Sequence, residues 1–313
     1  MTESVFIAGD WGTTHLRLYL CSHSRNMPPT ILASQMGPGV SQISDDFEQV
    51  FFDLAGDWLR EHGPMPVILS GMVGSNIGWH VAPYIECPAS AEQIVSGRIE
   101  FNARGIAFSI ISGLQTINPL GAPDLLRGEE LQLLGWMSAA ADIKTPQLIV
   151  LPGTHNKWAL VQDGKIEIFV TALTGELYSL LQNHSVLIAN AESADFSADI
   201  FMQGVVVATT LESGQLLQAL FATRSRQVLG ELSERYAAAY LSGLLIGSDV
   251  VGSLALMEKQ MGAISSVVLI GDPALSRCYQ LALEFVGIDT ELGDAAQIAI
   301  CGYGAIYESL YRA

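Results

Sequence analysis

The stretch VFIAGDWGTTHLRLYL, residues 5–20, predicts a β-hairpin with a polar tip. The apolar run over residues 5–8 is typical of a buried strand, and the alternation of Leu16, Leu18 and Leu20 with other residues is typical of its antiparallel partner. The tip between them holds one glycine and two threonines, whose N–H and hydroxyl donors suit the close approach of phosphate oxygens. Taken alone, the stretch fits an ordinary hairpin equally well.

The composition indicates a two-domain protein. The chain has 313 residues, about twice a typical domain, and half of them are hydrophobic. The longest apolar candidate, residues 236–257, contains Asp249 and several small polar residues, so no membrane span is predicted. The N-terminus predicts no signal peptide. The four cysteines form no C-x-x-C pair, which argues against a zinc site or disulfides and favours the cytoplasm.

The charge balance is acidic. A net charge of −17, with only 15 lysines and arginines, argues against a nucleic-acid partner. The overall field repels anions, so an anionic ligand must be held by a few local donors.

The expected elements occur twice. Strand, strand, strand, helix and strand are followed by an insertion, a strand at residues 106–112 and a helix at 128–141. The stretch LIVLPGTHNKW, residues 148–158, then repeats the opening pattern, since a shift of 141 residues places Gly153 and Thr154 over Gly12 and Thr13. Such internal repetition indicates a duplicated unit.

The duplication predicts two domains. The first comprises residues 1–140 and 295–313, and the second comprises residues 141–294. A largely helical insertion is expected at about 187–257 within the second domain.

Several motifs resemble those of the actin-like superfamily of sugar kinases. They are D-x-G-T-T-x-x-R at residues 10–17, the second Gly-Thr tip, and an apolar strand that ends in Gly271-Asp272-Pro273. Five further motifs resemble the 2-dehydro-3-deoxygalactonokinase family, and the resemblance spans the whole chain. These are GMVGSNIGW at 71–79, RGEE at 127–130, PGTHNKW at 152–158, TGEL at 174–177 and LSGLLIG at 241–247.

The resemblance implies an α/β fold of duplicated actin-like, ribonuclease H-like domains. Each domain would hold a five-stranded mixed sheet with flanking helices, and ATP would bind in the cleft between them. The family transfers a phosphoryl group from ATP to the terminal, 6-hydroxyl of a 2-keto-3-deoxy sugar acid. Galactonate and gluconate epimers are both compatible with the residues.

Phosphoryl transfer needs positioning, charge neutralisation and a base near the attacking hydroxyl. We expect Arg17 to reach the transferring phosphoryl group and Asp10 to hold Mg²⁺ through water. Glu129 matches the aspartate base of related kinases; Glu130 and Asp10 are alternatives, and a simple helix N-terminal charge is another. The nucleotide and its phosphates would contact Gly12, Thr13, Thr14, Gly153, Thr154, Gly271 and Asp272.

The substrate side must recognise a carboxylate beside a ketone. The candidates are Gly74, Ser75, Asn76, Arg127, His155 and Lys157. Arg127 could instead pair with a glutamate, and Lys157 could bind phosphate. Trp79 and Trp158 are expected in the core.

Two other functions fit the same scaffold: a non-catalytic nucleotide or sugar sensor, and an actin-like ATPase. The sequence contains no G-x-x-x-x-G-K-[ST] motif and no G-x-G-x-x-G after the first strand, which argues against other nucleotide-binding folds. A homodimer, formed through the helical segment at 195–257, is left open.

Overall fold

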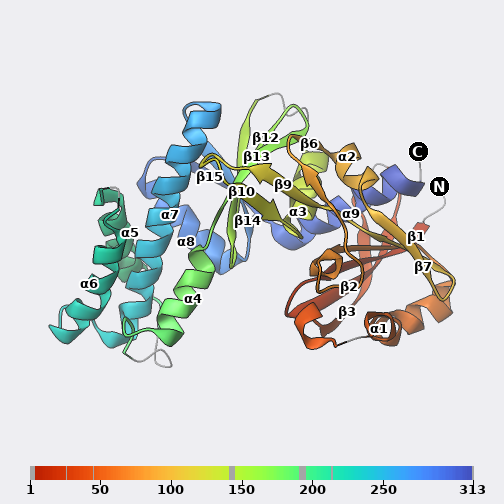
Figure 1. Ribbon diagram of the computed structural model, residues 1–313, viewed down its shortest axis with the longest axis horizontal. Coiled ribbons are helices and arrows are strands. Elements are labelled where there is room, and N and C mark those ends of the chain that lie inside the picture. Colours follow the sequence, from red (N-terminus) through yellow and green to blue (C-terminus); the bar gives the residue numbers. More distant parts are fainter. Residues whose placement is uncertain are drawn as a thin grey trace.

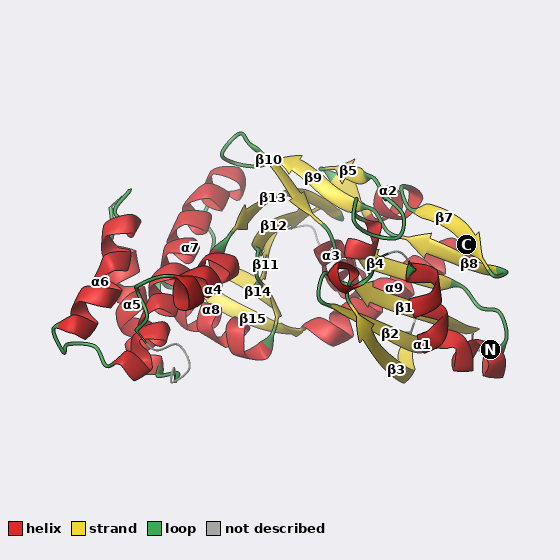
Figure 2. Cartoon of the chain, turned by 60° about the horizontal axis from the view of Figure 1, so that its bottom comes forward, coloured by secondary structure: helices red, strands yellow, loops and turns green. Residues whose placement is uncertain are grey.

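Two main β-sheets with flanking helices form the frame of the molecule (Figures 1 and 2). The computed structural model describes residues 4–25, 27–44, 46–140, 145–189, 195–212 and 214–311. The end of the helix predicted over residues 128–141 lies outside these ranges. So do residues 1–3, 26, 45, 142–144, 190–194, 213 and 312–313.

The first sheet has the strand order β3-β2-β1-β4-β8-β7. Its strands are β1 (Ser4–Trp11), β2 (His15–His23), β3 (Thr30–Pro38), β4 (Val67–Gly71), β7 (Ile99–Ala103) and β8 (Ile106–Ile110). β1 pairs antiparallel with β2, as predicted for the opening hairpin, and parallel with β4.

The second sheet repeats this plan with the order β15-β14-β11-β12-β13-β6. Its strands are β6 (Ala89–Ser90), β11 (Gln147–Leu151), β12 (Asn156–Gln162), β13 (Lys165–Ala172), β14 (Ser266–Gly271) and β15 (Asp289–Asp294). β11 pairs antiparallel with β12 and parallel with β14.

The duplication is confirmed by strand order and direction. The cores β3-β2-β1-β4-β8 and β13-β12-β11-β14-β15 have the same connectivity, with two antiparallel pairs followed by two parallel pairs. Each five-stranded core carries one additional edge strand, β7 or β6. These edge strands are not part of the predicted sheets.

A third sheet, absent from the sequence prediction, consists of β5 (Tyr84–Glu86), β9 (Gly113–Ile117) and β10 (Pro123–Leu126) in the order β10-β9-β5. Figure 2 shows β9 and β10 between the two main sheets. The following helix starts only three residues after β10. After β8 of the first main sheet, the chain therefore runs through β9 and β10, beside the second main sheet, to residues 127–130.

Nine α-helices occur in the described ranges, together with short 3₁₀ turns. They are α1 (Phe47–His62), α2 (Ala91–Ser96), α3 (Glu129–Ala139), α4 (Thr174–His184), α5 (Ala198–Thr210), α6 (Leu216–Val228), α7 (Ala237–Met261), α8 (Pro273–Phe285) and α9 (Ala295–Tyr311). The 3₁₀ turns used below are η1 (Val40–Gln42) and η2 (Met72–Gly74).

One hydrophobic cluster joins the two halves of the molecule. It includes Phe6 of β1, Ile149 of β11 and Tyr303 of α9. Although α9 follows the second sheet in sequence, it returns to the first, where Tyr307 stacks on Phe6 with ring centroids 4.6 Å apart. The hydroxyl of Tyr303 bonds to Ser70 at 2.8 Å. Helices α3 and α9 therefore lie within the shared core.

The long helix α7 is the main apolar helix of the second half. Residues 234–261 are long and apolar enough to cross a membrane, yet over half of the most apolar window is buried inside the protein. Helix α7 crosses α5 so closely that a Cβ on Gly243 would lie 1.9 Å from the carbonyl oxygen of Phe201. Such burial is that of a core helix.

Candidate active site

The first hairpin tip, between β1 and β2, is held by its carbonyl oxygens. The backbone N–H groups of Gly39, Val40 and Ser41 donate to the carbonyls of Thr14, Gly12 and Thr13 at 3.0–3.1 Å. Thr13 and Thr14 are exposed. Because the carbonyl oxygens of the tip accept hydrogen bonds from Gly39 and η1, the groups left for a ligand are hydrogen-bond donors. Phosphate binding requires such donors.

Asp10 and Arg17 stand opposite each other at the base of this tip. They are paired in the β1–β2 register, and Arg17 Nη1 lies 3.4 Å from Asp10 Oδ2. The side chain of Arg17 is 52% exposed and that of Asp10 is 41% exposed, so both remain accessible. Burial raises the pKa of Asp10, and the guanidinium of Arg17 opposes this rise.

The second tip, between β11 and β12, is held by helix α4. The N–H of Glu176 donates to Thr154 O at 2.9 Å. A Cβ on Gly175 would lie 2.4 Å from Gly153 O, so the helix can approach this closely only with a glycine there. His155 Nε2 lies 2.5 Å from Glu176 Oε2, and both side chains are about half exposed.

The start of α3 lies beside the end of β4. Gly71 and Gly128 have φ values of +89° and +110°, and a Cβ on Gly128 would come within 3.6 Å of the Gly71 Cα. A Cβ on Gly71 would in turn lie 3.3 Å from Asp10 Oδ1. The two left-handed glycines thus bring the start of α3 to the same edge of the sheet as Asp10.

Glu129 and Glu130 begin α3. Glu129 Oε2 accepts a hydrogen bond from Arg127 N at 3.1 Å, and Glu130 Oε2 accepts one from Gly128 N at 2.5 Å. Burial raises the pKa of Glu129, while the charges of Lys157 and His155 oppose the rise. The charges of two groups of the second hairpin therefore act on Glu129 of the first half.

The residues predicted to bind the sugar acid differ in availability. Asn76 is exposed. Ser75 is buried, and its hydroxyl donates to Met72 O at 2.7 Å. Gly74 is covered by the Arg127 side chain, since a Cβ there would lie 2.7 Å from Arg127 Nη1.

The Arg127 guanidinium contacts protein groups. It stacks over the Tyr84 ring at 4.3 Å and donates to Ala82 O at 2.8 Å. No glutamate side chain is among the partners found for this guanidinium within the described residues. In this arrangement Arg127 fixes the loop that follows η2 against the strand that leads to Glu129.

A pocket of about 330 Å³ opens beside the second tip. Its walls come from α4, α7 and α8, and they include Gly153, Thr174, Gly175, Tyr178, Ala239, Ser242, Leu275 and Tyr279. The motifs TGEL and LSGLLIG supply part of this lining, although sequence reasoning gave them no role.

Gly271 and Asp272, both predicted to contact the nucleotide, lie at the border of this region. A Cβ on Gly271 would be 3.0 Å from Pro152 O, so the end of β14 packs on the second tip. The side chain of Asp272 caps α8 by accepting from Ala274 N and Leu275 N at 2.9 and 3.0 Å. Leu275 of the same turn lines the pocket.

A buried carboxylate, that of Asp249, holds two of the residues that line the pocket. Asp249 of α7 accepts five hydrogen bonds, from Asn156, Trp158, Thr174, Ser253 and Tyr279, at 2.6–3.0 Å. Thr174 and Tyr279 are also pocket residues. Sequence reasoning missed this role, because a lone aspartate in an apolar helix does not indicate its partners.

The duplicated fold with its two matched hairpin tips is that of the actin-like class, and the comparisons with known proteins make it a phosphotransferase of that class. The chain matches the model of the 2-keto-3-deoxy-galactonokinase family over residues 10–306, and it belongs to that family. This membership implies ATP as the phosphoryl donor.

Individual relatives match over almost the full chain. The 2-dehydro-3-deoxygalactonokinase of Escherichia coli (strain K12) is 35% identical, with 93% of this chain and 94% of the relative covered. A Rhizobium meliloti (strain 1021) protein, to which the same activity is ascribed, is 32% identical over 99% of both chains. A crystal structure from Sinorhizobium meliloti, again with that activity ascribed, has a TM-score of 0.86 and 29% identity, covering 98% of this chain and 100% of the other.

Proposed function

We propose that this chain transfers the γ-phosphoryl group of ATP to the 6-hydroxyl of 2-dehydro-3-deoxy-D-galactonate, giving the 6-phosphate and ADP. The observation that carries the proposal is the position of Glu129: its carboxylate is influenced by the charges of the second hairpin, while its helix starts beside Asp10 and the first sheet. The names of the full-length relatives supply the substrate. Membership of a kinase family disfavours a sensor or a bare ATPase.

The two tips would hold the phosphates. Gly12, Thr13 and Thr14 would donate from one side, and Gly153 and Thr154 from the other. The pocket between α4, α7 and α8 would take the adenosine, with Gly271 and Asp272 at its border. Its mostly apolar lining suits a purine.

Glu129 would accept the proton of the attacking hydroxyl. Its pKa is raised by burial, which makes it a stronger base than an ordinary glutamate, and the charges of Lys157 and His155 oppose that rise. Arg17, about half exposed beside Asp10, would neutralise charge on the moving phosphoryl group. Water exclusion by the facing halves would limit ATP hydrolysis.

Mg²⁺ would bind mainly through the phosphates of ATP and through water. Among the described residues there is no group of three or more histidine, cysteine or acidic side chains able to hold a metal alone. Asp10, accessible and bonded only loosely to Arg17, fits an ion held through water. When bound, the ion would neutralise the charge of the phosphates.

The sugar acid would lie against the loop from η2 to Tyr84. Asn76 and His155 have accessible side chains for direct contact. Gly74 and Ser75 would act by shaping the loop, because their atoms already contact protein groups. Arg127 would hold the loop through Ala82 O, while its Nη1, which has no hydrogen-bond partner among the described residues, would be left for the substrate.

The proposal also covers the division into domains, the oligomeric state and the cellular location. We propose residues 1–140 with 295–313 as the substrate domain and 141–294 as the nucleotide domain, with the helical insertion at about 187–257. Leu217, Phe221 and Val228 of α6 are exposed on one face, which is the feature that a homodimer would use. The free cysteines suit a cytoplasmic location.

The test is an assay of ADP release coupled to a second enzyme, run with 2-keto-3-deoxy acids that carry or lack the terminal hydroxyl. Glu129→Gln should lower kcat by about 10²–10⁴ and Arg17→Ala by about 10²–10³. The control is Glu258→Gln, an exposed glutamate of α7, which should leave kcat unchanged. Wild-type turnover of a substrate without the terminal hydroxyl would contradict the proposal, as would normal kcat in Glu129→Gln.

A further inference from the structure

Lys157 of β12 is a buried lysine whose ammonium group bonds to protein atoms. Its exposed fraction is 5%. Nζ donates to the carbonyl of Leu125 and to the hydroxyl of Thr171, each at 2.8 Å. Two of its three N–H donors are therefore occupied without a ligand.

The partners of Lys157 form a network that crosses between sheets. Thr171 of β13 donates to Asp124 of β10 twice, from its backbone N–H at 2.8 Å and from its hydroxyl at 2.6 Å. Asn118 also donates to Asp124, at 3.1 Å. Lys157 and Thr171 belong to the second main sheet, whereas Asp124 and Leu125 belong to the small third sheet. The network thus fastens β10 to β12 and β13.

Strand β10 leads directly into Glu129. Leu125 precedes Glu129 by four residues, and the connection passes through Leu126, which is 2% exposed, and the left-handed Gly128. Because this connection is short and is anchored by the buried Leu126, we expect a displacement of β10 to reach the start of α3. The position of Glu129 consequently depends on the second sheet.

Several charged groups face Glu129. From β12 comes Lys157, from the second tip comes His155, and from α3 itself comes Glu130. Burial lowers the pKa of Lys157, and its interactions with Glu129 and Asp124 oppose that change. The ammonium group and the carboxylate of Glu129 therefore stabilise each other's charged forms.

We propose that Lys157 is a positioning residue for Glu129: together with Thr171 and Asp124 it holds β10 on the second sheet, and its ammonium supplies the positive charge that Glu129 faces. This assigns Lys157 to the base and not to the carboxylate of the sugar acid. The inference rests on the proposed kinase function.

The first test is Lys157→Met, with Lys165→Met, an exposed lysine of β13, as the matched control. We expect kcat to fall tenfold or more while KM for the sugar acid changes less than about threefold. The acid limb of the kcat–pH profile should move to higher pH, because Glu129 loses a neighbouring positive charge. A tenfold rise in KM with an unmoved acid limb would overturn the inference in favour of substrate binding.

Variants of Thr171 test the network while leaving the lysine in place. Thr171→Val removes the bridging hydroxyl and should lower kcat, whereas Thr171→Ser keeps the hydroxyl and should restore it. This pair decides the question if Lys157→Met does not fold. Wild-type kcat in Thr171→Val would overturn the positioning role.

A measurement without catalysis separates this inference from the proposed function. In protein labelled with ¹³C-glutamate, with Glu129→Gln used for assignment, NMR titration should show the Glu129 pKa about one unit higher in Lys157→Met than in wild type. An unchanged pKa would overturn the inference whether or not the chain phosphorylates a sugar acid. A raised pKa in a chain that turns over no 2-keto-3-deoxy acid would leave this contact standing and remove the kinase proposal.

Discussion

Glu129 and Glu130, neighbours in sequence, have separate environments although each bonds to the backbone just before it. Glu129 is partly accessible and faces Lys157, whereas Glu130 is fully buried and its Oε1 has no partner among the described residues. Burial and the charge of Glu129 raise the pKa of Glu130 to about 8. At pH 7 Glu130 is therefore mainly protonated, whereas the charge of Lys157 favours the ionised form of Glu129.

The raised pKa of Glu130 predicts that stability falls as pH rises. The folded form holds a proton up to about pH 8, whereas an unfolded glutamate releases it near its ordinary pKa of about 4.3. Between these values unfolding releases a proton, so each pH unit lowers the free energy of unfolding by at most about 1.4 kcal/mol. Urea unfolding at pH 5.5 and pH 8.5 measures the slope.

The variant Glu130→Gln, which cannot ionise, should show a flatter dependence and should gain stability over wild type at pH 8.5. Glu258→Gln on the surface of α7 is the control and should follow wild type. Equal slopes in wild type and Glu130→Gln would mean that Glu130 does not hold the proton.

The crossing of α3 and α9 depends on glycine. A Cβ on Gly135 would lie 1.8 Å from Ile298 O and 2.9 Å from Gly302 N, and both are backbone atoms that cannot turn away. Gly135→Ala should separate the helices and lower the free energy of unfolding by about 3 kcal/mol or more. Gly252→Ala, in an open position of α7, should instead add about 0.5–1 kcal/mol. Thermal unfolding of both variants checks this; equal effects would refute the close crossing.

Much of the fold could be predicted because its signals are local. The hairpin at residues 5–20 and its repeat at 148–158 carry alternating apolar residues and glycine tips, and duplication fixes how the strands between them pair. The third sheet could not be predicted, since its short strands bury only part of their side chains and β5 pairs with a strand far along the chain. Lys157 could be recognised as a functional candidate because it belongs to the repeated motif. Its bond to Leu125, and the bond of Thr171 to Asp124, could not be predicted, because each joins residues of different sheets.

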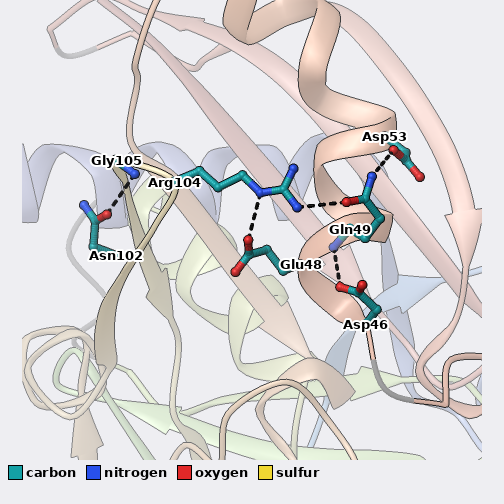
Figure 3. Close-up of polar contacts among 7 residues, drawn as sticks. All are labelled: Asp46, Glu48, Gln49, Asp53, Asn102, Arg104 and Gly105. Atoms are coloured by element: carbon teal, nitrogen blue, oxygen red, sulfur yellow. Dashed lines mark hydrogen bonds and ion pairs between the residues drawn. The ribbon is translucent and has the colours of Figure 1, made fainter.

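Arg104 forms an exposed ion pair, which is expected to contribute little to the free energy of unfolding. Arg104, in the β7–β8 turn, donates to Glu48 and Gln49 of α1 at 2.8 Å each (Figure 3). Its guanidinium also lies 4.6 Å from the centre of the Phe52 ring. These contacts join α1 to the edge of the first sheet, and none of them involves a residue assigned to the active site.

Arg104→Ala should lower the free energy of unfolding by only about 1 kcal/mol and leave kcat unchanged. The backbone of Arg104 has φ +49°, a conformation that costs a side-chain-bearing residue about 1 kcal/mol. Arg104→Gly should therefore be at least as stable as Arg104→Ala in chemical denaturation. A glycine variant clearly weaker than the alanine variant would show that the turn is not strained.

The five hydrogen bonds to Asp249 link the walls of the nucleotide pocket. Asn156 follows the second tip, Thr174 begins α4 and Tyr279 belongs to α8, so one carboxylate ties three elements to α7. All of these partners donate, so an acceptor-only side chain is required.

Asp249→Asn replaces one acceptor oxygen with a donor that faces other donors. We expect a loss of about 3 kcal/mol in unfolding free energy and a tenfold or greater rise in the Kd for ATP, because Thr174 and Tyr279 lose their fixed positions in the pocket wall. KM for the sugar acid should change little. Calorimetric titration with ATP, with the exposed Asp289→Asn as control, measures the effect. If the folded variant binds ATP as tightly as wild type, the nucleotide does not depend on this wall, and the assignment of the pocket to adenosine is wrong.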